Sequence, residues 1–174
     1  MKMNVSTAKK YNPSYKKKTI STDPYASKGA GADLSVCGGC HAVYTKKRWS
    51  FDPAVSVIAT KNRQAVTIVC PACLKIRDNF PGGIVTLKGA FVLAHKQEIL
   101  HLVKNEEEGA RGFNPLERVM SVKENGYGSI IISTTNEKLA QRLGRAIKKA
   151  FHGEVKYHWS NDNKLARVDW ERAA

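Results

Sequence analysis

Four cysteines in two closely spaced pairs constrain this chain more than any other feature. The motif CGGC occupies residues 37–40, CPAC occupies residues 70–73, and the chain has no further cysteine. The short turn inside each pair lets both thiolates face one point, and two such pairs complete a tetrahedral metal site. The spacing therefore predicts a structural zinc ion bound by Cys37, Cys40, Cys70 and Cys73.

Three other uses of these cysteines compete with zinc. An iron ion in a rubredoxin-like site would take similar ligands, so the choice between zinc and iron stays open. Residues 37–41 end in His41 and also match the haem c attachment motif CxxCH, but that attachment needs an exported protein. A redox dithiol would need one reactive pair, and the presence of two matched pairs disfavours it.

The charge balance predicts the class of partner. The chain carries 29 Lys and Arg residues against 15 Asp and Glu residues, a net charge of +14. Such an excess favours a polyanion, either nucleic acid or an acidic membrane. No stretch approaches the roughly 18 apolar residues of a membrane span, and the N-terminal residues lack the apolar run of a secretory signal. We expect a cytoplasmic protein without a membrane partner or a small-molecule substrate, in a compartment where CxxC pairs bind metal.

The composition divides the chain into three parts. Residues 1–33 are rich in lysine and small polar residues without hydrophobic periodicity, which predicts a disordered basic arm. Residues 34–83 hold both cysteine pairs, and the β-prone stretches 55–59 and 65–69 are expected to form a hairpin that completes a zinc ribbon. Residues 84–172 are expected to form a separate α/β domain.

The pattern in this third part predicts the element order β-α-β-β-α-β-β, which is ferredoxin-like with one added strand. Its first helix is expected over residues 91–105. The second helix is expected to begin with a capping box made by Thr134 and Glu137 and to end at Gly153. The predicted fold class is therefore α+β: a zinc ribbon followed by a ferredoxin-like unit, after a basic arm.

Two groups of cations are candidates for binding nucleic acid. Directly after the first cysteine pair, Lys46, Lys47 and Arg48 are expected to contact phosphates, and the adjacent Trp49 to stack on a base. The alternative places Trp49 in a small core beside the metal and the cations in solvent. The helix after residue 136 carries a second group at spacings of four, three and four, which puts its members on one face: Lys138, Arg142, Arg145 and Lys149. Like charges at that spacing repel, so a phosphate backbone is one reason to keep them and a solvated face is the other.

Segments 133–153 and 166–172, together with the two cysteine pairs, resemble the N-terminal module of the nuclear-export adaptor family of the large ribosomal subunit. The resemblance extends to its archaeal relatives and to small bacterial zinc proteins, and covers residues 35–172. That family has more cysteine pairs and further domains, so its export signals and partners do not carry over. The resemblance implies a module that meets ribosomal RNA or a ribosomal surface, and it supplies no catalytic residue.

The sequence thus favours a zinc-stabilised RNA-binding protein that is associated with ribosomes, as an assembly or regulating factor. No GxSxG, HExxH or P-loop motif is present, and we expect no enzymatic activity. The alternatives are a zinc-ribbon adaptor for a protein partner, a DNA-binding regulator, and an enzyme acting on nucleic acid with a structural zinc ion.

Overall fold

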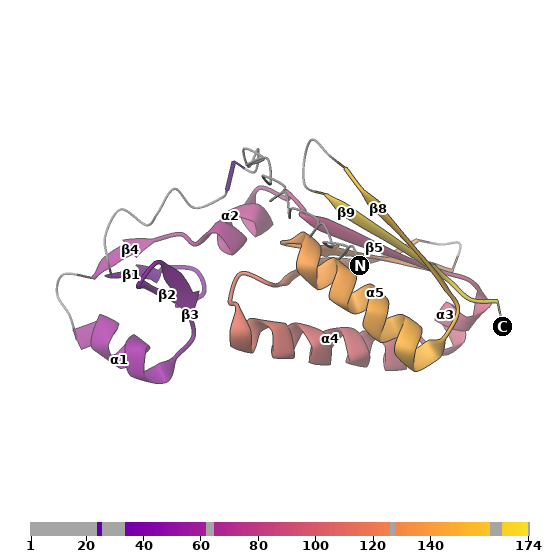
Figure 1. Cartoon of the computed structure of the whole chain (residues 1–174), viewed down its shortest axis with the longest axis horizontal. Coiled ribbons are helices and arrows are strands. Elements are labelled where there is room, and N and C mark those ends of the chain that lie inside the picture. The colour runs from indigo at the N-terminus through magenta and orange to yellow at the C-terminus, as the bar shows by residue number, and fades with distance from the viewer. Residues whose placement is uncertain (1–23, 26–33, 62–64, 126–127, 161–164, 174) are drawn as a thin grey trace, which may run out of the picture.

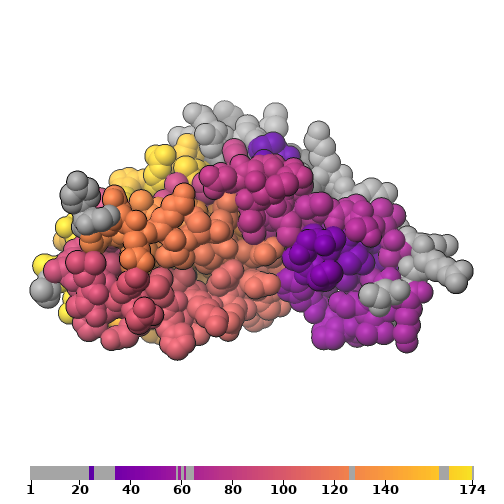
Figure 2. All heavy atoms as spheres, turned by 180° about the vertical axis from the view of Figure 1, so that it is seen from behind, coloured from indigo at the N-terminus to yellow at the C-terminus, as the bar shows by residue number. Residues whose placement is uncertain are grey.

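The computed structural model describes residues 24–25, 34–61, 65–125, 128–160 and 165–173. Within them the chain forms five α-helices and two β-sheets, which confirms the predicted α+β class. The two sheets belong to two units that lie side by side in an elongated molecule (Figures 1 and 2). Of the predicted basic arm, only Pro24 and Tyr25 belong to the described residues.

The first unit is built on a four-stranded sheet of short strands. Their order is β3-β2-β1-β4, and the members are β1 (Leu34–Cys37), β2 (Val43–Thr45), β3 (Arg48–Ser50) and β4 (Val66–Ile68). Strands β1, β2 and β3 are antiparallel, whereas β4 is parallel to β1. The connection from β3 to β4 contains helix α1 (Pro53–Lys61), and helix α2 (Pro71–Arg77) follows β4.

The predicted hairpin between residues 55–59 and 65–69 is wrong, because the first of these stretches lies in α1. Asp52 stands just before the helix and its carboxylate accepts a 2.9 Å hydrogen bond from the amide of Ala54. Pro53 occupies the first helical position, where its fixed φ suits a helix and its missing N–H costs nothing. This start signal overrides the β preference of the valines that follow, so β4 pairs with β1 instead.

The second unit has the predicted order of strands and helices. Its sheet runs β6-β7-β5-β9-β8, with members β5 (Gly83–Lys88), β6 (Val119–Asn125), β7 (Ser129–Thr134), β8 (Glu154–Trp159) and β9 (Ala166–Glu171). The helix expected over residues 91–105 is divided at His95 into α3 (Ala90–Ala94) and α4 (Lys96–Phe113). The last strand, β9, lies between β5 and β8 and is parallel to β5. The ferredoxin-like assignment stays a prediction.

Helices α4 and α5 (Glu137–Phe151) cover one face of this larger sheet (Figure 1). Alternate strand residues such as Val85, Leu87 and Trp170 are fully buried beneath them, as the period of two in a strand requires. Helix α5 approaches the sheet closely at Gly144, where an added Cβ would lie 2.6 Å from Cγ1 of Val168. Burial of each large side chain stabilises the fold by about 1.5–3 kcal/mol, so this core stabilises the second unit.

The cap of α5 differs from the predicted capping box. Thr134 is the last residue of β7, and its hydroxyl donates to the carbonyl of Asn136 over 2.8 Å. Asn136 is the N-cap instead, since its side-chain oxygen accepts a 3.0 Å hydrogen bond from the amide of Leu139. An asparagine at the N-cap satisfies a free helical N–H as well as a threonine does. Thr134 is part of strand β7, so it is not available as the cap.

Candidate metal centre

The sulfur atoms of the four cysteines form one compact cluster. All four Sγ atoms lie within 4.8 Å of one another, with 3.8 Å between Cys37 and Cys73 and 3.6 Å between Cys40 and Cys70. Tetrahedral zinc with Zn–S bonds of about 2.3 Å places its sulfur ligands about 3.8 Å apart. A disulfide needs about 2.05 Å, so these thiols are free and spaced for a shared ion. The predicted clustering is confirmed, and the donor set fits a closed metal site.

The first cysteine pair follows directly from the end of β1. Its turn is closed by two backbone hydrogen bonds, from the amide of Cys37 to the carbonyl of Ala42 at 2.8 Å and from the amide of His41 to the carbonyl of Cys37 at 2.9 Å. A Cβ added at Gly39 would lie 3.3 Å from the Sγ of Cys73. Glycine at this position therefore leaves room for the opposite ligand.

The second cysteine pair reaches the first because β4 runs parallel to β1. Cys37 pairs with Ile68 in the register, so the chain leaving β4 places Cys70 beside the first pair. Cys70 is the N-cap of α2, and its Sγ accepts a 3.4 Å hydrogen bond from the amide of Cys73. The amide of Cys70 in turn donates to the Sγ of Cys37 over 3.3 Å. Backbone N–H groups thus face the sulfurs and stabilise negative charge on them.

The thiols influence one another's ionisation because they are so close. The side-chain contact with Cys70 lowers the pKa of Cys40 to about 4. The same contact, together with burial, raises the pKa of Cys70, and burial raises the pKa of Cys73. A divalent cation would replace the protons held by the raised thiols and relieve the repulsion among four thiolates.

Arg118 connects the metal centre to the second unit. Its Nη1 atom donates a 3.2 Å hydrogen bond to the Sγ of Cys73. The backbone of Arg118 is fixed by Thr135, whose hydroxyl accepts from the Arg118 amide and whose amide donates to the Arg118 carbonyl, both at 2.9 Å. The sequence gives no sign of this contact, because a pair separated by 45 positions leaves no spacing pattern. A guanidinium in this place compensates thiolate charge, which orients and retains the ligand.

The base-stacking role predicted for Trp49 is not compatible with its position. Its side chain is only 5% exposed and belongs to the small core around Cys37 and Cys70. Its ring packs on Tyr44 with 5.3 Å between the ring centroids, and Leu116 of the second unit packs against the same cluster. The alternative stated above is therefore the right one: Trp49 packs beside the metal centre.

The predicted cations lie on both units. Lys46, Lys47 and Arg48 are exposed at the turn between β2 and β3. On α5, Lys138, Arg145 and Lys149 are exposed and Arg142 is half-buried. Among the residues described by the structure, none of these seven cations forms an ion pair with a carboxylate. Both groups are therefore available to meet an anion, one on each unit.

Comparisons with known proteins give no assignment: family models, curated proteins and solved structures contain no match to this chain. In the part of the chain that the structure describes, none of the helices is both long enough and apolar enough to span a membrane. Function is therefore inferred from the side chains and their arrangement.

Proposed function

We propose that this protein is a zinc-stabilised, non-catalytic RNA-binding protein that associates with ribosomes, built on a zinc-binding unit and a ferredoxin-like unit. The observation that carries the proposal is the combination of a closed four-cysteine cluster with exposed cations that have no carboxylate partner among the described residues. Four thiolates leave no open position at zinc, so the ion organises the fold while the cations meet phosphates.

The first unit depends on the ion because its apolar core is small. Its buried cluster consists of two cysteines with Ala42, Tyr44, Trp49 and Ala72, and three of its four strands have only three residues. A structural zinc ion contributes an apparent 10–16 kcal/mol, roughly, in small zinc-finger peptides. Zinc binding on that scale exceeds what such a core supplies, so metal and fold should be lost together.

Helix α5 is favoured over the open face of the larger sheet as the RNA contact. Strand residues between the buried ones point away from the helices. The open face they form mixes cations with acids, namely Lys88, Lys123, Lys156 and Arg167 with Glu154, Asp169 and Glu171. Among the described strand residues, this face carries His158 but no Phe, Tyr or Trp, so it lacks the large aromatic rings that stack best on bases. The α5 face, by contrast, carries cations with one acid at its start, Glu137.

A matched pair of variants tests this choice. One replaces the four α5 cations by glutamine: Lys138, Arg142, Arg145 and Lys149. Its control replaces the four cations of the open sheet face by glutamine: Lys88, Lys123, Lys156 and Arg167. Both variants remove the same charge, and binding to ribosomal RNA fragments is titrated at several salt concentrations.

The α5 variant should flatten the dependence of log K on log salt by up to about 2.8, since each lost contact with single-stranded RNA removes about 0.7. The control should keep most of the original slope. Equal losses in both variants would mean that only net charge matters and would contradict an α5 site. Crosslinking in cells, followed by sequencing of the bound RNA, should recover ribosomal RNA, and recovery of no RNA would refute the proposed partner.

A protein partner is the second candidate, and exposed apolar side chains in the first unit favour it. Val66 and Val69 are 46% and 45% exposed at and just after β4, which is an edge strand of its sheet, and Val57 of α1 is 51% exposed. An unpaired edge with apolar neighbours is a place where another chain can add a strand. Under this alternative, the α5 variant would still bind its partner with unchanged affinity.

A further inference from the structure

Two aromatic rings of strand β8 lie at the margin of the larger sheet, on the face that α4 and α5 cover (Figure 1). Tyr157 and Trp159 are two positions apart, so their side chains leave the strand on the same face. Tyr157 pairs with Val168, which is buried beneath α5. The two rings are stacked, with 5.9 Å between the centroids and 17° between the planes. They form one aromatic surface, the β8 platform, with the geometry of an offset-stacked pair.

The two rings of the β8 platform differ in exposure. Tyr157 is half-buried and packs against the core of the second unit. A Cβ added at Gly144 of α5 would lie 3.2 Å from the Tyr157 hydroxyl. Trp159 is 58% exposed, and its partner across the sheet is Ala166, whose methyl group is too small to cover an indole ring. Strand β8 is the last strand of its sheet. The Trp159 ring is therefore accessible to a further planar ring from solution.

Exposed cations of α5 stand next to the β8 platform. Arg145 directly follows Gly144, the residue that faces Tyr157. Lys148 lies one helical turn beyond Gly144, on the same edge of the helix. Both cations are exposed, and neither forms an ion pair with a carboxylate among the residues that the structure describes. Aromatic rings and available positive charge thus meet along one edge of α5.

The aromatic ring and the positive charge lie toward opposite ends of this edge. Strand β8 runs back along α5 after the short turn at residues 152–153, so Trp159 lies toward the start of the helix and Lys148 toward its end. The first residue of α5 is its one acid, Glu137, which would repel a phosphate there. A bound polyanion should therefore run from Trp159 toward Lys148.

We infer that the β8 platform is a stacking site for one unpaired base of a single-stranded RNA, whose backbone contacts Arg145 and Lys148. This inference rests on the proposed RNA-binding function and adds to it the part of the RNA that is recognised. Every base has a face that can stack on an aromatic ring, and neighbouring cations hold the phosphates of a single strand. A protein partner would also gain from an exposed indole, but it would not explain the cations beside the ring.

Tryptophan fluorescence reports on the platform directly. The chain has three tryptophans, and two of them, Trp49 and Trp170, are buried. Binding of an unstructured single-stranded oligoribonucleotide should quench the fluorescence of the parent protein, because a base stacked on Trp159 contacts its indole. The variant Trp159→Phe should show no quenching on binding. Quenching of equal size in this variant would overturn the platform.

Affinity for the same oligoribonucleotide gives the magnitude. Trp159→Ala should weaken binding about 5- to 150-fold, which is the range for loss of one stacked base. The dependence of log K on log salt should stay unchanged, because the indole carries no charge. Trp159→Phe should recover most of the affinity. The matched control Phe113→Ala removes a ring that is 78% exposed at the end of α4, and it should bind like the parent. Equal losses in Trp159→Ala and Phe113→Ala would overturn a specific stacking site.

A matched pair of lysine variants tests the backbone contact. Lys148→Gln should lower the slope of log K against log salt by about 0.7, the value for one phosphate contact with a single strand. The control Lys156→Gln removes the same charge from the opposite face of β8 and should keep the parent slope. Equal slopes in the two variants would overturn the role of Lys148.

Duplex RNA of the same sequence completes the test. Trp159→Ala should bind the duplex like the parent, because paired bases are covered by their neighbours, and an equal loss on the duplex would overturn stacking. A parent protein that binds no RNA would overturn both the proposed function and the platform. If the α5 variant loses RNA binding while Trp159→Ala keeps it, the proposed function stands and the platform alone is overturned.

Discussion

Replacing the two lysines of the β2–β3 turn by the sequence Asn-Gly should stabilise the protein and weaken its binding to RNA. Thr45 and Arg48 pair across this hairpin, so only Lys46 and Lys47 form its loop. Their φ angles are 48° and 62°, both in the left-handed region. Two-residue hairpin loops of this kind strongly prefer Asn-Gly, because lysine has a Cβ that crowds its own carbonyl there.

The size of the stability gain follows from that strain. A non-glycine residue held at positive φ costs about 1 kcal/mol or more. Glycine removes the cost at Lys47 and asparagine reduces it at Lys46, while the flexibility of glycine in the unfolded state offsets part of the gain. The variant Lys46→Asn/Lys47→Gly should therefore gain about 1.5 kcal/mol in the free energy of unfolding. For a chain of this size that raises Tm by about 3–6 °C.

The loss of binding has its own magnitude. If both lysines contact phosphates, their removal should reduce the slope of log K against log salt by about 1.4 for single-stranded RNA. Urea unfolding of the metal-loaded protein and fluorescence anisotropy with ribosomal RNA fragments measure the two effects. The control Lys46→Arg/Lys47→Arg keeps both charges and the strained turn, so it should match the parent in both assays.

Either half of this prediction can fail by itself. A variant no more stable than the parent would refute the strain assigned to Lys46 and Lys47. A more stable variant with unchanged affinity and salt slope would show that this turn is only a solvated surface and does not contact RNA.

Three further substitutions test the metal centre and the packing. Arg118→Gln should weaken zinc affinity about 10–100-fold, because the Sγ of Cys73 loses a charged hydrogen-bond donor. Competition with a chromophoric chelator measures the zinc affinity, and an unchanged zinc affinity would contradict the role of Arg118. Trp49→Phe should leave RNA affinity unchanged, because the ring is buried, and a loss like that of the turn variant would restore a stacking role. Gly144→Val should destabilise the second unit by about 1–3 kcal/mol in thermal unfolding, since its Cβ would meet Val168, and a neutral result would refute the close approach of α5.

Local patterns were enough to predict the ligand set and several elements. The two CxxC spacings identified the four cysteines that cluster, because each pair forms within a single turn. The apolar period of 3.6 located α5, and the order of strands and helices in the second unit followed from alternation and turns. Each of these features depends on neighbours within a few positions, which sequence displays directly.

Competing local signals explain two wrong predictions, the hairpin strand at residues 55–59 and the stacking role of Trp49. The stretch from Val55 to Ala59 is β-prone, but the start signal at Asp52 and Pro53 turned it into helix α1. The sequence pattern of Trp49 beside three cations is the same whether the ring stacks on a base or packs in the core. Burial decides between the two, and burial depends on which elements pack together.

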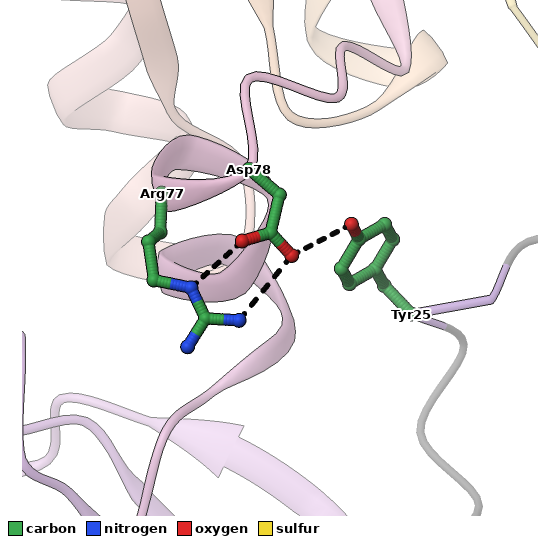
Figure 3. Close-up of polar contacts among 3 residues, drawn as sticks. All are labelled: Tyr25, Arg77 and Asp78. Atoms are coloured by element: carbon green, nitrogen blue, oxygen red, sulfur yellow. Dashed lines mark hydrogen bonds and ion pairs between the residues drawn. The ribbon is translucent and has the colours of Figure 1, made fainter.

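The sequence by itself determined that four thiolates would meet and that one helix would present a row of cations. Tertiary structure decided what surrounds them. Only the parallel pairing of β4 with β1 brings the second cysteine pair to the first. Only the packing of the two units brings Arg118 within hydrogen-bond distance of Cys73, and Lys75 within hydrogen-bond distance of Thr135. Only the folded chain brings the hydroxyl of Tyr25 to the carboxylate of Asp78 (Figure 3). These contacts join residues 45 to 60 positions apart, and their energy appears only after the intervening chain has folded.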